Sequence, residues 1–173
     1  MTKAGLVLFN GKYINITPPP CLAPPIFGSH SVCQGTAISL ADVDTGGTWV
    51  SSNTTVAIVG SASGIVIGIT PGNDTITYTS PLACVNTFTV TVNTAPAPIS
   101  GLDSVCAGAT IILNDAVTGG TWSSSNTLKA TIGSVSGIVT GVVAGTATIT
   151  YLTSAGCLAT KAITVNATAN PGT

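Results

Sequence analysis

The chain has 173 residues, of which 45% are hydrophobic and only 5% are charged, against about 25% charged residues in an ordinary soluble protein. Four lysines and five aspartates give a formal net charge of −1. Nucleic-acid binding needs clustered cations, and a membrane helix needs about 20 consecutive apolar residues. The sequence has neither, so we expect no nucleic-acid partner and no membrane span.

The first predicted element is a β-hairpin, because two apolar runs flank Asn10-Gly11, a strong turn signal. An isolated hairpin is marginal in water. We therefore expect it to dock on its own domain or to add a strand to a neighbouring subunit; a disordered tail is the alternative. The apolar side chains of this assembly arm are Leu6, Val7, Leu8, Phe9, Tyr13, Ile14 and Ile16.

A proline-rich stretch follows the predicted hairpin, and residues 17–25 include five prolines and Cys21. Prolines stiffen a linker and remove backbone donors, so residues 1–25 are interpreted as a hairpin arm on a semi-rigid stalk. The short apolar run before Asn10 does not fit a signal peptide. Either a signal has been removed or the protein never used one.

The rest of the chain is an internal repeat. Residues 26–93 align with residues 99–166 at a constant offset of 73, and 36 of the 68 positions are identical. A gapless repeat of this length indicates that each copy is a complete fold unit. We expect domains at 26–94 and 99–167, separated by a linker at 95–98 and followed by a tail at 168–173.

Each copy shows short strands separated by turn residues. In the second copy, Ala147, Ile149 and Tyr151 alternate with threonines, which places them on one face of a strand. No window has helical periodicity. Six or seven short strands in about 70 residues predict a small antiparallel sandwich. The expected strands lie at 110–113, 119–123, 130–132, 138–140, 145–151 and 159–165.

Three motifs carry a resemblance to a known family: Gly119-Gly-Thr-Trp-Ser-Ser-Ser-Asn126, Ser136-Gly-Ile-Val-Thr-Gly141 and Ala144-Gly-Thr-Ala-Thr-Ile-Thr-Tyr151. They resemble the group 2 bacterial Ig-like domains (BIG2), in a cysteine-containing variant common in Bacteroidetes surface proteins. The first copy departs from the pattern at Val50, Ile67 and residues 70–74.

The resemblance implies an all-β chain, with two tandem immunoglobulin-like β-sandwiches preceded by the N-terminal hairpin arm. Members of the family serve as spacers or adhesive modules on cell surfaces or phage virions, and they share no catalytic residues. The fold alone does not confer a function.

Four of the five cysteines occupy equivalent positions: Cys33 with Cys106, and Cys84 with Cys157. Within each copy the two cysteines are 51 residues apart. The sequence favours one disulfide per copy, Cys33–Cys84 and Cys106–Cys157, with the first cysteine beginning the first strand. Buried thiols are the alternative; no metal-ligand spacing is present. Cys21 is left over, either free or paired with another chain.

Other residues give weaker signals. His30 is the only histidine and has no recognisable catalytic partners. Trp49 and Trp122 are expected in the core, with a glycan-binding platform as the alternative. Tyr78 and Tyr151 are expected in the core. The aspartates near turns are expected to cap those turns, because no run of clustered oxygen ligands for calcium is present. We expect no enzyme, cofactor or metal.

Three functions compete. The first is a structural virion component, a head decoration or tail protein, anchored by its arm. The second is a bacterial surface adhesin or extracellular filament subunit that assembles by strand donation. The third is a carbohydrate-binding module. All three place the protein on a virion, outside the cell or at its surface. The expected partners are other, often identical, subunits, with host-surface or mucosal glycans as further candidates.

Overall fold

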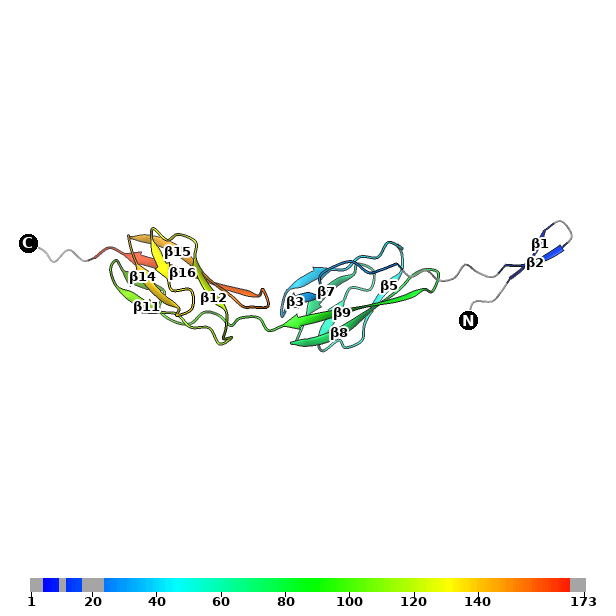
Figure 1. The fold of residues 1–173 in the computed structure, drawn as a ribbon, viewed down its shortest axis with the longest axis horizontal. Coiled ribbons are helices and arrows are strands. Elements are labelled where there is room, and N and C mark those ends of the chain that lie inside the picture. The colour runs from blue at the N-terminus through cyan, green and yellow to red at the C-terminus, as the bar shows by residue number, and fades with distance from the viewer. Residues whose placement is uncertain (1–4, 10–11, 17–23, 169–173) are drawn as a thin grey trace, which may run out of the picture.

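The computed structural model describes residues 5–9, 12–16 and 24–168. Two β-sandwich modules lie end to end (Figure 1). The described residues form no helix, so none is available to cross a membrane. Within the N-terminal arm, β1 (Gly5–Phe9) pairs antiparallel with β2 (Lys12–Ile16). This confirms the predicted hairpin; Asn10 and Gly11 themselves lie outside the described residues.

Module 1 is a sandwich of a four-stranded and a three-stranded sheet. The strand orders are β3-β9-β8-β5 and β4-β7-β6. All pairs are antiparallel except β3 with β9, the first and last strands, which run parallel. The strands are β3 (Ser31–Cys33), β4 (Ala37–Ser39), β5 (Thr48–Ser51), β6 (Ala57–Val59), β7 (Ile65–Gly68), β8 (Gly72–Thr79) and β9 (Val85–Asn93).

Module 2 repeats this topology strand for strand. Its sheets are β10-β16-β15-β12 and β11-β14-β13, again with the first and last strands parallel. The strands are β10 (Ser104–Cys106), β11 (Thr110–Ile112), β12 (Thr121–Ser124), β13 (Ala130–Ile132), β14 (Ile138–Gly141), β15 (Gly145–Leu152) and β16 (Leu158–Asn166). The all-β, Ig-like prediction is confirmed.

Each module has its own hydrophobic core between the two sheets. The alternation predicted for β15 is confirmed, because Ala147, Ile149 and Tyr151 are buried. Three large apolar side chains are almost fully enclosed in module 2: Leu113, which directly follows β11, Ile149 of β15 and Ile163 of β16. Burying a side chain of this size contributes about 1.5–3 kcal/mol, so the sandwich interior supplies the main stabilising term.

One strand was missed in each copy. The sequence placed Cys33 at the beginning of the first strand, but Cys33 ends β3, and the same holds for Cys106 and β10. These three-residue strands are too short to show alternation. Their parallel pairing with the last strand determines where the cysteines lie.

Candidate functional site: the junction between the modules

The two modules are joined by a disulfide between Cys33 and Cys157. Their Cα atoms are 5.7 Å apart, and 124 residues of chain separate them. Cys33 ends β3 of module 1, whereas Cys157 lies just before β16 of module 2. In Figure 1 the hairpin between β15 and β16 reaches towards the β3 end of module 1. The bond therefore crosses the junction.

This pairing shows that the predicted Cys33–Cys84 bond was wrong. Cys33 lies opposite Asn93, the last residue of β9, while Cys84 precedes the first residue of the same strand. Nine strand residues at about 3.3 Å each place the two cysteines about 30 Å apart. A disulfide needs Cα atoms within about 7 Å. The parallel pairing thus puts the two cysteines of one module at opposite ends.

The predicted Cys106–Cys157 bond was wrong for the same reason. Cys106 is opposite Asn166 at the end of β16, and its thiol is free and exposed. Cys84, the counterpart of Cys157, is disulfide-bonded. Cys21 lies outside the described residues, so its predicted role is not tested. Three of the four repeated cysteines are thus bonded, and Cys106 retains its thiol.

A tight loop positions Cys157 for the junction. The Thr153 amide donates to the Cys157 carbonyl at 2.8 Å, and the Cys157 amide donates to Thr153 Oγ1 at 3.1 Å. Gly156 supplies the left-handed backbone conformation that the turn requires, with φ at +83°. Cys157 is only 1% exposed. The loop holds its sulfur in a fixed place at one pole of module 2.

Cys33 is held equally firmly at the facing pole of module 1. The Gln34 amide donates to the Asn93 carbonyl at 2.9 Å, and the Thr36 amide donates to the Cys33 carbonyl at 3.0 Å. The inter-module linker begins directly after Asn93, the strand partner of Cys33. Two covalent connections therefore leave adjacent strands of module 1 and enter module 2, which restricts bending and twisting between the modules.

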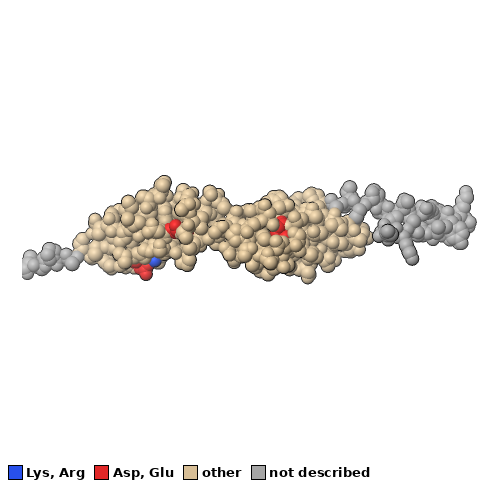
Figure 2. All heavy atoms as spheres, turned by 90° about the horizontal axis from the view of Figure 1, so that it is seen from below, with Lys and Arg blue, Asp and Glu red and all other residues tan. Residues whose placement is uncertain are grey.

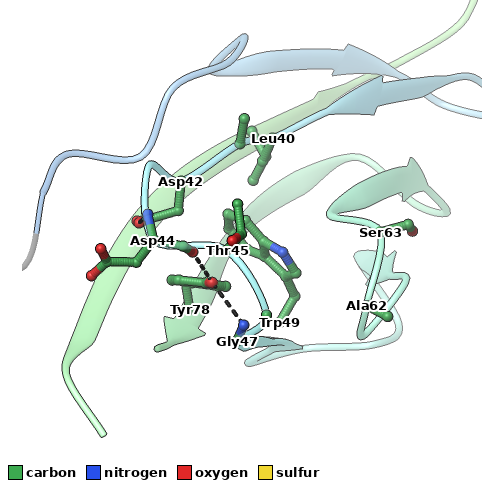
Figure 3. Close-up of a pocket in the computed structure, with 11 residues that line it drawn as sticks. Leu40, Asp42, Asp44, Thr45, Gly47, Trp49, Ala62, Ser63 and Tyr78 are labelled. Carbon is green, nitrogen blue, oxygen red and sulfur yellow. Dashed lines mark hydrogen bonds between the residues drawn. The ribbon is translucent and has the colours of Figure 1, made fainter. Parts of the chain in front are cut away.

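The repeated Gly-Gly-Thr-Trp motif borders a shallow hollow of about 230 Å³ in module 1 and one of about 220 Å³ in module 2. In Figure 3 the Tyr78 hydroxyl lies between the backbone of Gly47 and that of Asp44. The Gly47 amide donates to this hydroxyl at 2.9 Å, and the hydroxyl donates to the Asp44 carbonyl. The ring of Trp49 packs against Tyr78 with centroids 4.5 Å apart.

The motif residues around this hollow maintain the fold. A Cβ on Gly47 would come within 2.3 Å of the Thr79 carbonyl oxygen, and one on Gly64 within 2.5 Å of the Leu40 carbonyl oxygen. Trp49 and Trp122 are 6% and 8% exposed. This confirms their predicted core position and leaves no ring face available as a glycan platform.

Asp42 and Asp115 cap the turns beside the two hollows, as predicted for these two aspartates; Asp103 instead pairs with Lys161. Asp42 Oδ1 accepts a hydrogen bond from the Asp44 amide at 2.9 Å, and Asp115 Oδ1 accepts one from the Val117 amide at 2.8 Å. The other carboxylate oxygen of both Asp42 and Asp115 is enclosed and has no hydrogen-bond partner among the described residues. Within residues 5–9, 12–16 and 24–168, no group of three or more His, Cys, Asp or Glu side chains could hold a metal ion.

His30 packs against the last strand of module 1, β9. Its ring stacks on Phe88 with centroids 4.0 Å apart, and its Nδ1 lies 2.9 Å from the Thr89 carbonyl oxygen. The equivalent positions in module 2 are Asp103 and Lys161, which form an ion pair. One contact between the loop before the first strand and the last strand is thus aromatic in module 1 and ionic in module 2. The face of the molecule seen in Figure 2 carries very few charged side chains.

Comparison with known proteins supports the fold. No protein-family profile matches the chain, and no curated protein is similar in sequence. A C-terminal fragment of intimin, solved in complex with the intimin-binding domain of the translocated intimin receptor, has a TM-score of 0.51 at 18% identity. The alignment covers 83% of this chain and 64% of that fragment, so this chain spans less than two thirds of it.

Two further solved structures align at lower TM-scores. Domains 4 and 5 of the S-layer protein SbsC give 0.33 at 23% identity, covering 77% of this chain and 82% of that one. Drosophila N-cadherin EC1-4 gives 0.35 at 14% identity, covering 87% of this chain and 49% of that one. The likeness to the intimin fragment supports the fold alone.

Proposed function

We propose that this chain is a non-enzymatic structural and adhesive protein of an exposed surface, in which two Ig-like modules form a stiff spacer. The observation that carries the proposal is the Cys33–Cys157 disulfide across the junction. A flexible linker alone would leave the modules free to reorient. A second covalent link restricts that motion, which suits a spacer that must hold a surface at a fixed distance.

The chemistry of the chain agrees with such a setting. Disulfides form and persist in oxidising surroundings, including the outside of cells and the surfaces of virions. With charged residues at 5% of the chain, solubility depends on threonine, serine, asparagine and glycine. A surface of this kind offers little electrostatic attraction to nucleic acid. We also propose that the modules belong to the group 2 bacterial Ig-like domains that their motifs resemble.

Within this class, our first candidate is a virion component, a head decoration or tail protein anchored through the N-terminal hairpin. The alternative is a bacterial cell-surface adhesin or filament subunit, and the inter-module disulfide favours this alternative because such proteins mature outside the reducing cytosol. In both cases the partners are other protein subunits. The intimin fragment was solved with a receptor domain bound; binding of a protein partner by this chain is part of the proposal.

Two measurements test the function. Immunogold labelling with an antibody against residues 26–166 is expected to mark virions in the first setting and the bacterial surface in the second. Deleting residues 1–20 is expected to leave both modules folded and to abolish incorporation into the particle or filament. Replacing residues 1–20 with an unrelated hairpin of equal length is the matched control and should also fail to incorporate. Normal incorporation of the truncated chain would refute the anchor.

A further inference from the structure

The free pole of module 2 repeats the pole through which module 1 is joined to its neighbour. Cys106 ends β10 opposite Asn166, as Cys33 ends β3 opposite Asn93. Cys33 is bonded across a junction, whereas Cys106 is a free, exposed thiol. A cysteine thus occupies the same position in both modules, and it forms a disulfide in module 1 but keeps its thiol in module 2.

The backbone around Cys106 is set in the same way as that around Cys33. The Ala107 amide donates to the Asn166 carbonyl at 2.8 Å, and the Ala109 amide donates to the Cys106 carbonyl at 3.0 Å. The corresponding bonds beside Cys33 measure 2.9 and 3.0 Å. The backbone at Cys106 is thus held by the module's own fold before any neighbour is present.

Exposed apolar side chains surround this pole. Gly141 bridges to Ala107, next to Cys106, and the two residues that follow it, Val142 and Val143, are 43% and 53% exposed. The Lys129 carbonyl accepts hydrogen bonds from the amides of both valines. Leu128, the residue before Lys129, is 76% exposed. These side chains offer apolar area that a docked neighbour would bury.

We propose that this pole is the docking face for a further Ig-like module of the same type. That module presents a hairpin cysteine at the position of Cys157, and Cys106 forms a disulfide with it. The occupant follows from continuity with the Cys33–Cys157 junction. Repetition of this bond gives a rod in which a disulfide closes each junction.

The bond is formed by oxidation of two thiols. Cys106 and the hairpin cysteine lose two protons and two electrons as their sulfurs join. A disulfide oxidant such as oxidised glutathione takes up both electrons and both protons and leaves as two thiols. The inference concerns how modules are linked, and it holds in either the virion or the cell-surface setting.

The test extends the full chain by one module. A second copy of residues 94–173 replaces residues 167–173, so that the added module follows residue 166 with the native linker and ends with the native tail. After folding in a glutathione redox buffer, the protein is treated with iodoacetamide and mapped by mass spectrometry without reduction. We expect a cross-linked peptide that joins Cys106 to the added hairpin cysteine, with loss of alkylation at Cys106. The added copy carries serine at its counterpart of Cys106, so that every Cys106 peptide comes from the original module 2.

The matched control replaces the added hairpin cysteine with serine, which should restore complete alkylation of Cys106 while the added module stays folded by circular dichroism. Two outcomes would overturn the proposal: Cys106 remains fully alkylated in the extended chain, or it is bonded to Cys106 of a second copy. Neither outcome would bear on the surface location measured by immunogold labelling, so failure of this inference and failure of the proposed function are distinguishable.

Discussion

Cys33 lies opposite Asn93 in the parallel β3–β9 pair, so the disulfide and the linker leave module 1 side by side. In the chain-entropy model, closing 124 residues of chain stabilises the folded state by about 5 kcal/mol. The larger consequence of the disulfide is mechanical, because the linker and the disulfide together cannot act as a free hinge between the modules. This relationship underlies the first prediction.

The double variant Cys33→Ser/Cys157→Ser should loosen the junction without unfolding either module. We expect small-angle scattering to show a broader distribution of interatomic distances and a smaller radius of gyration than for the parent chain. Cys106→Ser is the matched control, since it removes the equivalent thiol from a position that makes no bond. If the double variant and the control scatter identically, the disulfide does not stiffen the rod.

Tyr151→Phe should destabilise module 2 alone. The substitution leaves the Gly120 amide and the Val117 carbonyl, now bonded to the hydroxyl at 2.8 and 2.5 Å, without their partner. Both bonds are partly buried, so losing them should cost about 1 kcal/mol. Hydrogen exchange followed by mass spectrometry should show faster exchange in β12 and β15 only. Tyr78→Phe should affect β5 and β8 instead; exchange unchanged in both variants would argue against this role for the tyrosines.

Two neighbouring glycines should differ in their tolerance of alanine. Gly119 has φ at +81° with open space around its Cβ position, so Gly119→Ala should cost about 1–2 kcal/mol in backbone strain. A Cβ on Gly120 would come within 2.6 Å of the Leu152 carbonyl oxygen, and this overpacking should cost about 3 kcal/mol. Thermal unfolding of the two variants should rank them in this order, and equal melting temperatures would contradict it.

Asp74 occupies a core-facing position of β8 and is 2% exposed. Its carboxylate accepts hydrogen bonds from Ser51 Oγ, Ser52 Oγ and the Asn53 amide at 2.7, 2.7 and 2.9 Å. Asp74→Ala should destabilise module 1 by about 1–3 kcal/mol, because these donors lose their acceptor. Urea unfolding monitored by hydrogen exchange provides the measurement.

The reciprocal change is the control for this prediction. Module 2 has Ala147 at the position equivalent to Asp74. The three donor residues are present in its sequence at the corresponding positions, as Ser124, Ser125 and Asn126. Ala147→Asp should therefore be tolerated better than an aspartate placed at Ile149, where no such donors occur in the repeat. A larger loss of stability for Ala147→Asp than for Ile149→Asp would show that the donors do not support the carboxylate.

Much of the fold could be predicted from the sequence. Alternation identified β15 and β16, and the gapless repeat indicated two equal units. The Trp and Tyr side chains of the repeated motifs were correctly expected in the core. These features are local, since each depends on residues near one another in the chain.

The disulfide pattern could not be predicted in this way. The repeat makes Cys84 and Cys157 equivalent partners for Cys33, and no spacing distinguishes a bond within a module from one between modules. The deciding fact is the parallel pairing of β3 with β9, which separates Cys33 from Cys84 by the length of a strand. A three-residue strand has too little pattern to reveal that pairing.

The most direct test of the rod is the disulfide map of the unmodified chain. The protein is alkylated, digested without reduction at aspartate and aromatic residues, and analysed by mass spectrometry. The structure predicts that Cys33 and Cys157 occur together in a cross-linked peptide and that Cys106 is alkylated. A cross-linked peptide containing Cys33 and Cys84, with Cys106 joined to Cys157, would contradict it and would leave the two modules connected by the linker alone.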